Sequence, residues 1–479
     1  MANSIHIADL TNEQAEKIRL VEESQFAEVK AKEKLPKVLS EDISAFANAD
    51  GGDLYIGITD QERLWLGFEN EEAANGFLQL FEELFPLGTY FHYEFLRCSS
   101  KKGLVLHIQI IKTQDIFKAS SGLPYIRRGA QSLPVNTPEK RKRLEFMKGV
   151  ASFETELTNA PKEVITESPI TKKFIEDVVP TTTPEPWLKK QRLLCDDRPT
   201  VAGILLFAEE PQAILQKNCG IKIYRYKTSE SEGFRDVLAG DIKTIEGNLY
   251  NQIKEAVKNT QKITESIPKM GASGFEKIKY PPEALHEIIT NAVLHRDYSV
   301  KDDIHIRIFD NRVEVLSPGK LPAHITVKNI LDERFARNGA IVRILNKFPN
   351  PPNKDVGEGL NTAFTKMQEL GLKPPEIKEL ENAVLVLIKH EPLASPEEAI
   401  MAYLEVNETI KNAKARQITY IRTDNKMKNI LNKMAVANLI EKLPNTKTSA
   451  TAWRKKKHGQ IVATPTPMPI TKSKTLLDF

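Results

Sequence analysis

The stretch EIITNAVLHRDY, residues 287–298, constrains the fold of this 479-residue chain more than any other segment. Glu287 and Asn291 are four residues apart, so on a helix their side chains lie on one face, one turn from each other. A carboxylate that can activate water beside an amide oxygen that can bind a divalent cation suits a nucleotide-hydrolysing site. The same spacing is also typical of the solvated face of an ordinary amphipathic helix. Apolar residues at helical spacing provide the opposite face: Leu285, Ile288, Ile289 and Ala292.

The segments after this helix favour the nucleotide site. Residues 304–322, IHIRIFDNRVEVLSPGKLP, predict two strands around a turn at Asp310–Asn311, followed by Ser317–Pro318–Gly319. Further along, Gly357–Glu358–Gly359 leads into a helical pattern. Glycines before a helix let backbone N–H groups approach phosphate oxygens at the positive end of the helix. Each glycine pair alone is typical of a plain turn, but the ordered series predicts a nucleotide-binding module.

In this order of motifs, residues 200–390 resemble the ATP-binding module of a family of bacterial and archaeal transcriptional regulators. That module belongs to the gyrase- and histidine-kinase-type ATPases, the Bergerat fold. The resemblance implies ATP and Mg²⁺ as cofactors, with Glu287 as general base and Asn291 as magnesium ligand. It also implies that the following glycines shape the pocket: Gly319 under the adenine, and Gly357 and Gly359 at the mobile lid.

One position departs from the pattern of the resembled superfamily. An aspartate two residues before the first glycine usually binds adenine there, whereas this chain has Ser317, which can form a hydrogen bond but carries no charge. The sequence HRDY, which typifies the resembled family, follows the Glu287 helix. His295 falls on the helical face of the predicted site, and Arg296 and Asp297 are expected to pair at the helix end and fix the next loop.

The N-terminal region predicts a second module. Residues 23–60 contain a strand-like run at 26–30, then a helix, then a glycine pair at 51–52 and another strand at 54–58. The motifs E-S-x-x-x-E-x-K and N-x-x-G-G in this stretch are similar to those of the AlbA-like nucleic-acid-binding domain shared with the Schlafen proteins. The helix is expected to bury one stripe: Leu35, Val38, Leu39, Ile43 and Phe46.

Some Schlafen members cut RNA with three carboxylates, which the motif match places at Glu23, Glu28 and Glu69. Such a cluster would hold Mg²⁺ or Mn²⁺ and activate a water for phosphodiester hydrolysis. The alternative is that Glu23 and Glu28 belong to the fold signature, paired with Lys30, in a domain that only binds nucleic acid. The sequence leaves both open.

The C-terminal region resembles a winged helix–turn–helix. Ser395–Pro396 begins a helix, residues 411–419 form a second, and Thr423 caps a third that buries Met427 and neighbouring apolar residues. A β-wing with a basic cluster follows. A small helical oligomerisation module is the alternative, and the charge favours nucleic-acid contact over that module, with DNA rather than RNA as the expected partner. The residues expected to contact nucleic acid are Asn425, Lys428, Asn429, Asn432, Lys433, Arg454, Lys455, Lys456 and Lys457.

The charge distribution supports this assignment. Residues 401–479 contain 15 Lys and Arg against 5 Asp and Glu, whereas residues 1–400 contain 53 against 59. A basic end of this kind favours polyanions through counterion release.

The remaining features predict an ordinary multidomain protein of α/β (α+β) class. No run approaches the length of a membrane span, no signal-peptide layout begins the chain, and three scattered cysteines form neither a disulfide framework nor a zinc motif. A cytoplasmic location fits. Residues 178–187 are expected to be an exposed linker, and residues 198–215 to begin with a strand-like run. The expected segments are an AlbA-like domain at 1–135, a helical linker at 136–199, a connecting α/β segment at 200–275, the ATP-binding domain at 276–392, the winged helix at 395–458 and a disordered tail at 459–479.

Together these observations predict a protein in which ATP binding rearranges nucleic-acid-binding parts, for transcriptional control or defence against foreign nucleic acid. The resemblance to the ATPase superfamily also implies a homodimer or larger homo-oligomer. The competing hypotheses are an ATP-gated nuclease and a scaffold that binds no nucleotide. The tail ends in Leu476, Leu477 and Phe479, which could dock on a protein partner or simply fray.

Overall fold

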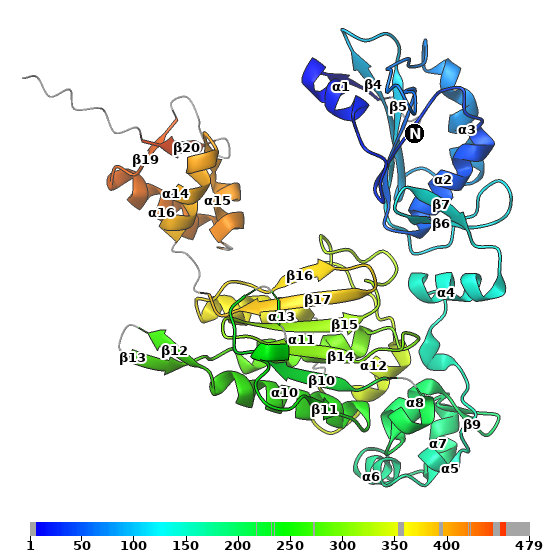
Figure 1. Ribbon diagram of the computed structural model, residues 1–479, viewed down its shortest axis with the longest axis vertical. Coiled ribbons are helices and arrows are strands. Elements are labelled where there is room, and N and C mark those ends of the chain that lie inside the picture. The colour runs from blue at the N-terminus through cyan, green and yellow to red at the C-terminus, as the bar shows by residue number, and fades with distance from the viewer. Residues whose placement is uncertain are drawn as a thin grey trace, which may run out of the picture. The chain divides into compact units, whose positions relative to one another are not determined.

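A computed structural model describes residues 6–216, 218–230, 232–233, 235–271, 274–352, 359–391, 396–419, 421, 423–443 and 451–456. The chain forms two compact units, Met1–Glu391 and Pro392–Phe479. Helices and several mixed sheets make it a multidomain α/β protein, as predicted (Figure 1). Within the described ranges, none of the helices is long and apolar enough to cross a membrane.

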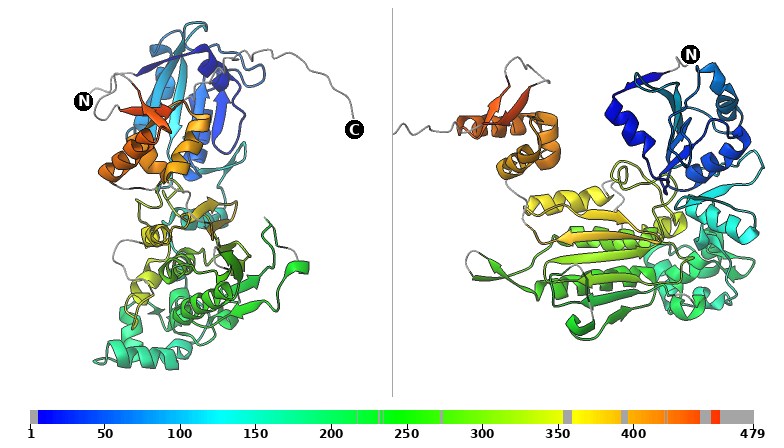
Figure 2. Two further views of the ribbon diagram at one scale, coloured as in Figure 1. Left: turned by 90° about the vertical axis from the view of Figure 1, so that its left-hand side faces the viewer. Right: turned by 45° about the horizontal axis from the view of Figure 1, so that its top comes forward.

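The first domain is built on a five-stranded sheet with the order β1-β4-β5-β3-β2. Helix α1 lies on one face of this sheet, and α2 and α3 lie on the other (Figures 1 and 2). β1 runs parallel to β4 and β2 parallel to β3, while the central pairs are antiparallel. The elements are β1 (Ile7–Leu10), α1 (Asn12–Arg19), β2 (Ala27–Lys30), α2 (Pro36–Asn48), β3 (Gly52–Ile56), α3 (Asn75–Glu83), β4 (Phe91–Cys98) and β5 (Val105–Ile110).

Helix α2 occupies the predicted position, but two of the five residues predicted for its buried stripe are exposed. Leu39, Ile43 and Phe46 are fully buried, whereas Leu35 and Val38 are 68% and 44% exposed. Leu35 precedes the first helical residue, Pro36, so it lies outside the helical period. After α2 the chain turns at Gly51, where a Cβ atom would lie 2.6 Å from the Ile110 carbonyl oxygen. Only glycine fits this left-handed, crowded turn.

A hairpin and a set of short helices connect the two sheets of the first unit. The hairpin β6 (Tyr125–Arg128) and β7 (Gln131–Pro134) packs on α2. Two sequence predictions are wrong in this region. Helix α7 begins inside the expected linker and buries Trp187, and the apolar run at 201–207 is a helix. The elements after the hairpin are α4 (Pro138–Lys148), α5 (Glu163–Thr166), α6 (Pro169–Val178), α7 (Pro184–Lys190), β8 (Leu194–Cys195), β9 (Arg198–Pro199), α8 (Val201–Phe207) and α9 (Pro211–Leu215).

The second sheet has six strands in the order β11-β10-β14-β15-β17-β16 (Figure 1). Helix α11 packs against α10, α13 and the sheet. The apolar faces of these three helices and the strands of the sheet form one hydrophobic core. The predicted strand pair around Asp310–Asn311 is confirmed as the antiparallel pair β14–β15. The elements are β10 (Ile221–Arg225), β11 (Lys243–Ile245), α10 (Leu249–Glu265), β12 (Pro268–Gly271), β13 (Gly274–Lys277), α11 (Pro282–His295), β14 (Ile304–Ile308), β15 (Arg312–Pro318), α12 (Gly339–Leu345), α13 (Gly359–Glu369), β16 (Glu376–Glu379) and β17 (Ala383–Lys389).

The second unit has its own small core. Ile400, Met427, Leu431 and Trp453 are among its buried residues. Its described strands form an antiparallel sheet with the order β18-β20-β19. The elements are α14 (Pro396–Val406), β18 (Ile410–Lys411), α15 (Asn412–Thr419), α16 (Asp424–Val436), β19 (Ile440–Lys442) and β20 (Ala452–Lys455).

Candidate nucleotide site and nucleic-acid-binding surfaces

Helix α11 presents the predicted acid–amide pair. Its apolar stripe of Leu285, Ile288, Ile289 and Ala292 is buried, which turns Glu287 and Asn291 to the less buried side. The Asn291 Nδ2 atom donates a hydrogen bond of 2.7 Å to Glu287 Oε1. This bond uses the amide nitrogen, so the amide oxygen stays available to a cation.

The environment of Glu287 makes it a better proton acceptor. Burial raises the pKa of the Glu287 carboxyl above its ordinary value, against the lowering effect of the bond from Asn291. A carboxylate with a raised pKa accepts a proton more readily near neutral pH, which is what activation of a water molecule requires. The site therefore has a group of the right chemistry for a general base.

The second glycine element faces this carboxylate. Gly359 is the first residue of α13, has φ +38°, and a Cβ atom on it would lie 3.9 Å from Glu287 Oε1. The start of α13 thus lies beside the acid–amide pair. Gly357 lies outside the described residues.

The first glycine element lies at the end of α11. Gly319 follows β15 with φ +100°, and a Cβ atom there would lie 2.5 Å from the Asp297 Cβ atom. Its backbone N–H donates to the Asn382 carbonyl at 2.8 Å. Ser317 donates its hydroxyl proton to the Ala292 carbonyl on α11 at 2.8 Å, which leaves its oxygen as a hydrogen-bond acceptor.

An ion pair that the sequence did not reveal holds these elements together. The Asp297 Oδ2 atom accepts from Arg337 Nη1 at 3.0 Å, and Arg337 also donates to the Lys320 carbonyl. Both side chains are buried, at 8% and 7% exposure. The predicted partnership of Arg296 with Asp297 is wrong, because Arg296 donates instead to backbone carbonyls of residues 218, 300 and 302. Asp297 and Arg337 are 40 residues apart, so no local spacing signals their contact.

His295 is expected to be neutral at pH 7. Burial, reinforced by the nearby Arg337 guanidinium, lowers the pKa of His295 to about 4. A neutral imidazole adds no positive charge that would lower the pKa of Glu287. Burial therefore remains the cause of the raised pKa of this carboxyl. This supports a structural role for His295.

The three N-terminal carboxylates do not share one environment. Glu28 is buried and its carboxylate is bonded to both Lys30 and Arg127. Glu23 lies 3.8 Å from Arg63, and burial with the nearby Glu28 charge raises its pKa. Glu69 is exposed. Among the residues that the structure describes, no group of three or more His, Cys, Asp and Glu side chains could hold a metal ion. The geometry gives the nuclease hypothesis no support, and it stays a prediction.

Arg127 explains why Glu28 is buried. From the β6–β7 hairpin, its guanidinium donates to the Ser24 carbonyl at 2.9 Å and lies 4.6 Å from the centre of the Phe46 ring. It therefore ties the hairpin to the start of β2 and to α2, with the Glu28 carboxylate balancing its charge.

Helix α16 of the second unit has the predicted division of faces. Met427, Leu431 and Met434 are buried. A hollow of about 530 Å³ lies on its surface, with Asn429, Asn432 and Lys433 in the lining. The residues predicted to contact nucleic acid from this helix are all exposed: Asn425, Lys428, Asn429, Asn432 and Lys433.

The basic cluster after β19 is partly engaged within the unit. Arg454 pairs with Glu441 at 2.6 Å, and Lys455 pairs with Glu405. Lys456 donates to Asn438 Oδ1 at 2.7 Å, and Lys457 lies outside the described residues. The charges of Arg454 and Lys455 are thus partly neutralised within the unit, so the exposed face of α16 is the stronger candidate surface.

Two family models match the chain. Residues 23–136 match the model described as "Schlafen, AlbA_2", and residues 301–388 match the model described as "Putative ATP-dependent DNA helicase recG C-terminal". The chain contains a Schlafen AlbA_2 domain and an ATPase-like domain, which point to a function that involves ATP and nucleic acid. The second match includes Ser317 and Gly319 but begins after α11, so Glu287 and Asn291 lie outside it.

Other comparisons add little. No curated protein matches the chain. It is similar to the crystal structure of the DIP2311 protein from Corynebacterium diphtheriae, with 17% identity and a TM-score of 0.43 over 92% of this chain and 96% of that chain.

Proposed function

We propose that this protein binds ATP with Mg²⁺ in its ATPase-like domain and uses the bound nucleotide to control contacts with nucleic acid. The observation that carries the proposal is the Glu287–Asn291 hydrogen bond on α11, facing the start of α13 at Gly359. A carboxylate, an amide and the start of a helix lie together there. In the proposed complex the carboxylate serves the attacking water, the amide serves Mg²⁺ and the helix start serves the phosphates.

The chemistry of the donor set fits the proposed ligand. Carboxylate and amide oxygens are hard ligands of the kind that Mg²⁺ prefers. When bound, the cation supplies neutralisation of phosphate charge. Asn291 would hold the cation through its amide oxygen, and Glu287 would accept a proton from the attacking water. The Ser317 hydroxyl donates to the Ala292 carbonyl, which leaves its oxygen as an acceptor, and we assign it the adenine amino group as donor.

The nucleic-acid contacts are assigned to both ends of the chain. The AlbA_2 domain supplies one surface. We assign the second to a winged helix–turn–helix in which α16 enters the DNA major groove, because its exposed face carries asparagines and lysines. We propose that such a nucleotide-dependent homo-oligomer serves in transcriptional control or in defence against foreign nucleic acid.

Substitutions on α11 test this function. Glu287→Gln should keep nucleotide binding but lower ATP turnover by about 10²–10⁴-fold, the usual loss when a general base is removed. The matched control is Glu283→Gln, an exposed glutamate one turn earlier on the same helix. Turnover would be followed by phosphate release, and nucleotide affinity by calorimetry. Equal turnover in both variants would remove Glu287 from the catalytic role.

A further inference from the structure

The segment Lys320–Ile325, which follows the first glycine element, is held from two sides. Within the ATPase-like domain, Arg337 donates to the Lys320 carbonyl, and the Leu321 N–H donates to Glu379 Oε1 at 2.9 Å. The segment is therefore attached to the pocket, because its neighbour Gly319 is packed against Asp297 at the end of α11.

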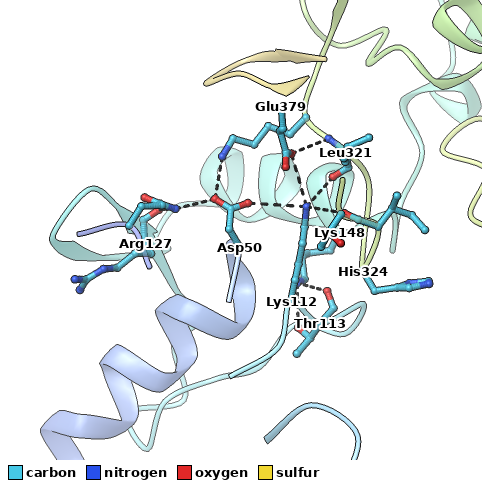
Figure 3. Close-up of polar contacts among 12 residues, drawn as sticks. Asp50, Lys112, Thr113, Arg127, Lys148, Leu321, His324 and Glu379 are labelled. Atoms are coloured by element: carbon cyan, nitrogen blue, oxygen red, sulfur yellow. Dashed lines mark hydrogen bonds and ion pairs between the residues drawn. The ribbon is translucent and has the colours of Figure 1, made fainter. Parts of the chain in front are cut away.

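The other side of the segment is held by the AlbA_2 domain (Figure 3). Lys112 Nζ donates to the carbonyl oxygens of Leu321 at 3.0 Å and Ile325 at 3.2 Å. The same ammonium lies 3.9 Å from Asp50 and 3.8 Å from Glu379. Lys112 is only 6% exposed, so these contacts replace nearly all of its hydration.

Two further contacts complete the attachment. Asp50, at the end of α2, forms an ion pair of 3.0 Å with Lys320. The Ala323 N–H donates to the Met147 carbonyl on α4 at 3.3 Å, and Ala323 itself has φ +50°. A buried non-glycine residue in this left-handed region is retained only when its surroundings fix it.

The contacts continue into the nucleic-acid-binding domain. Asp50 accepts a hydrogen bond of 2.9 Å from Gln25, which also donates to the Arg127 carbonyl. Arg127 in turn holds Glu28 and the start of β2. Lys148, at the end of α4, donates to Ala47 and to Thr113, the residue after Lys112. A continuous path of polar contacts thus runs from Lys320, the residue after Gly319, to the β2 edge of the first sheet.

The charges in this path make it sensitive to small movements. The ammonium groups of Lys320 and Lys112 outweigh burial and hold the pKa of Asp50 below its ordinary value, while burial lowers the pKa of Lys112. Withdrawing one partner leaves another buried charge uncompensated, which is costly. A shift of the segment must therefore be followed by Asp50 and Lys112 or break their contacts.

We propose that Lys320–Ile325 is a joint through which nucleotide binding alters the AlbA_2 domain, with Lys112 and Asp50 as its positioning residues. The inference rests on the proposed nucleotide function. It adds the route by which the ATPase-like domain reaches the nucleic-acid-binding domain. Both domains hold the same short segment, so each biases its position.

Hydrogen exchange on the full-length protein, with and without Mg-ATP, tests the joint. In the wild type, Mg-ATP should change exchange by several-fold at α11 and also at residues 47–50 and 112–113. In Lys112→Met, the change at α11 should remain and the change at residues 47–50 should disappear. Lys118→Met, an exposed lysine of the same domain, is the control and should behave as the wild type.

The outcomes separate the joint from the proposed function. Two results overturn the joint while leaving nucleotide binding intact. One is a wild-type exchange effect confined to the ATPase-like domain. The other is an undiminished Mg-ATP effect at residues 47–50 in Lys112→Met. No effect at α11 overturns both. If Lys112→Met does not fold, Lys320→Met removes the ion pair to Asp50 from a partly exposed position and must reduce transmission to residues 47–50.

Discussion

The side chains of the candidate pocket differ in how far local sequence determines their positions. Glu287 and Asn291 could be predicted to lie close together because a helix repeats every 3.6 residues, and in the structure they are hydrogen-bonded. Arg337 and Asp297 could not, since their contact exists only when the chain after β15 returns to the end of α11. The same holds for Arg127, which reaches Glu28 across 99 residues of sequence.

The buried position of Glu28 gives a stability prediction. Glu28→Ala leaves Arg127 and Lys30 without their carboxylate, so we expect a loss of about 3–5 kcal/mol, the usual cost of breaking a buried ion pair. Denaturant unfolding followed by fluorescence would measure it. Glu69→Ala, at an exposed position, should leave the unfolding midpoint unchanged.

The nuclease hypothesis predicts a different pattern for these two variants. It requires that both lose metal-dependent cleavage of labelled RNA or DNA. A Glu28→Ala protein as stable as the wild type would contradict the structural role assigned here.

A second residue-scale prediction concerns pH. His107 on β5 lies between Asp53 at 2.8 Å and Glu94 at 3.0 Å. Burial alone would lower the pKa of His107, but hydrogen bonds to both carboxylates outweigh it and raise the pKa. Because the folded-state pKa lies above that of the unfolded chain, the stabilisation is complete below about pH 6.5 and disappears as pH rises through the raised value.

The measurement compares wild type with His107→Gln in urea between about pH 5.5 and 8.5. The stability difference should be largest at the acidic end of this range and shrink toward the basic end. His92→Gln, exposed on the neighbouring strand β4, provides the control. A difference that stays constant with pH would show that protonation of His107 contributes nothing.

Among whole elements, periodic segments could be predicted and short apolar runs could not. Helix α11 and the β14–β15 pair follow from patterns with a single period. The run VAGILLF is predicted to be a strand but forms α8. All seven of its residues are buried, so the sequence has no polar–apolar period that could distinguish a helix from a strand. Residues 178–187 are predicted to be an exposed linker from their prolines and threonines, yet Pro184 begins helix α7, where its missing N–H costs nothing.

The turn after β15 gives the prediction at this scale. Gly319→Ala places a Cβ atom 2.5 Å from Asp297 Cβ at φ +100°, so the turn must shift. We expect a destabilisation of about 1–3 kcal/mol and weaker ATP binding, because the turn connects the pocket to α11. Gly339→Ala is the control, since nothing lies within 4 Å of its added Cβ. Thermal unfolding and nucleotide titration would check both, and unchanged ATP affinity in Gly319→Ala would contradict a role for this turn in the pocket.

For the whole molecule, the separation into two compact units predicts separable activities. A chain ending at Glu391 keeps the first unit and loses the strongly basic end. It should still bind Mg-ATP, but its affinity for duplex DNA should be lower and depend less steeply on salt. Fluorescence anisotropy with labelled duplex at several salt concentrations measures this. The same salt slope in both proteins would assign duplex binding to the first unit.

The central claim is that Mg-ATP binds beside α11, and calorimetric titration of the full-length protein tests it most directly. The account predicts a saturable heat with ATP and Mg²⁺ that weakens in Asn291→Ala and persists in Glu283→Gln. The absence of any heat with the folded wild-type protein, or an identical affinity in Asn291→Ala, would contradict it.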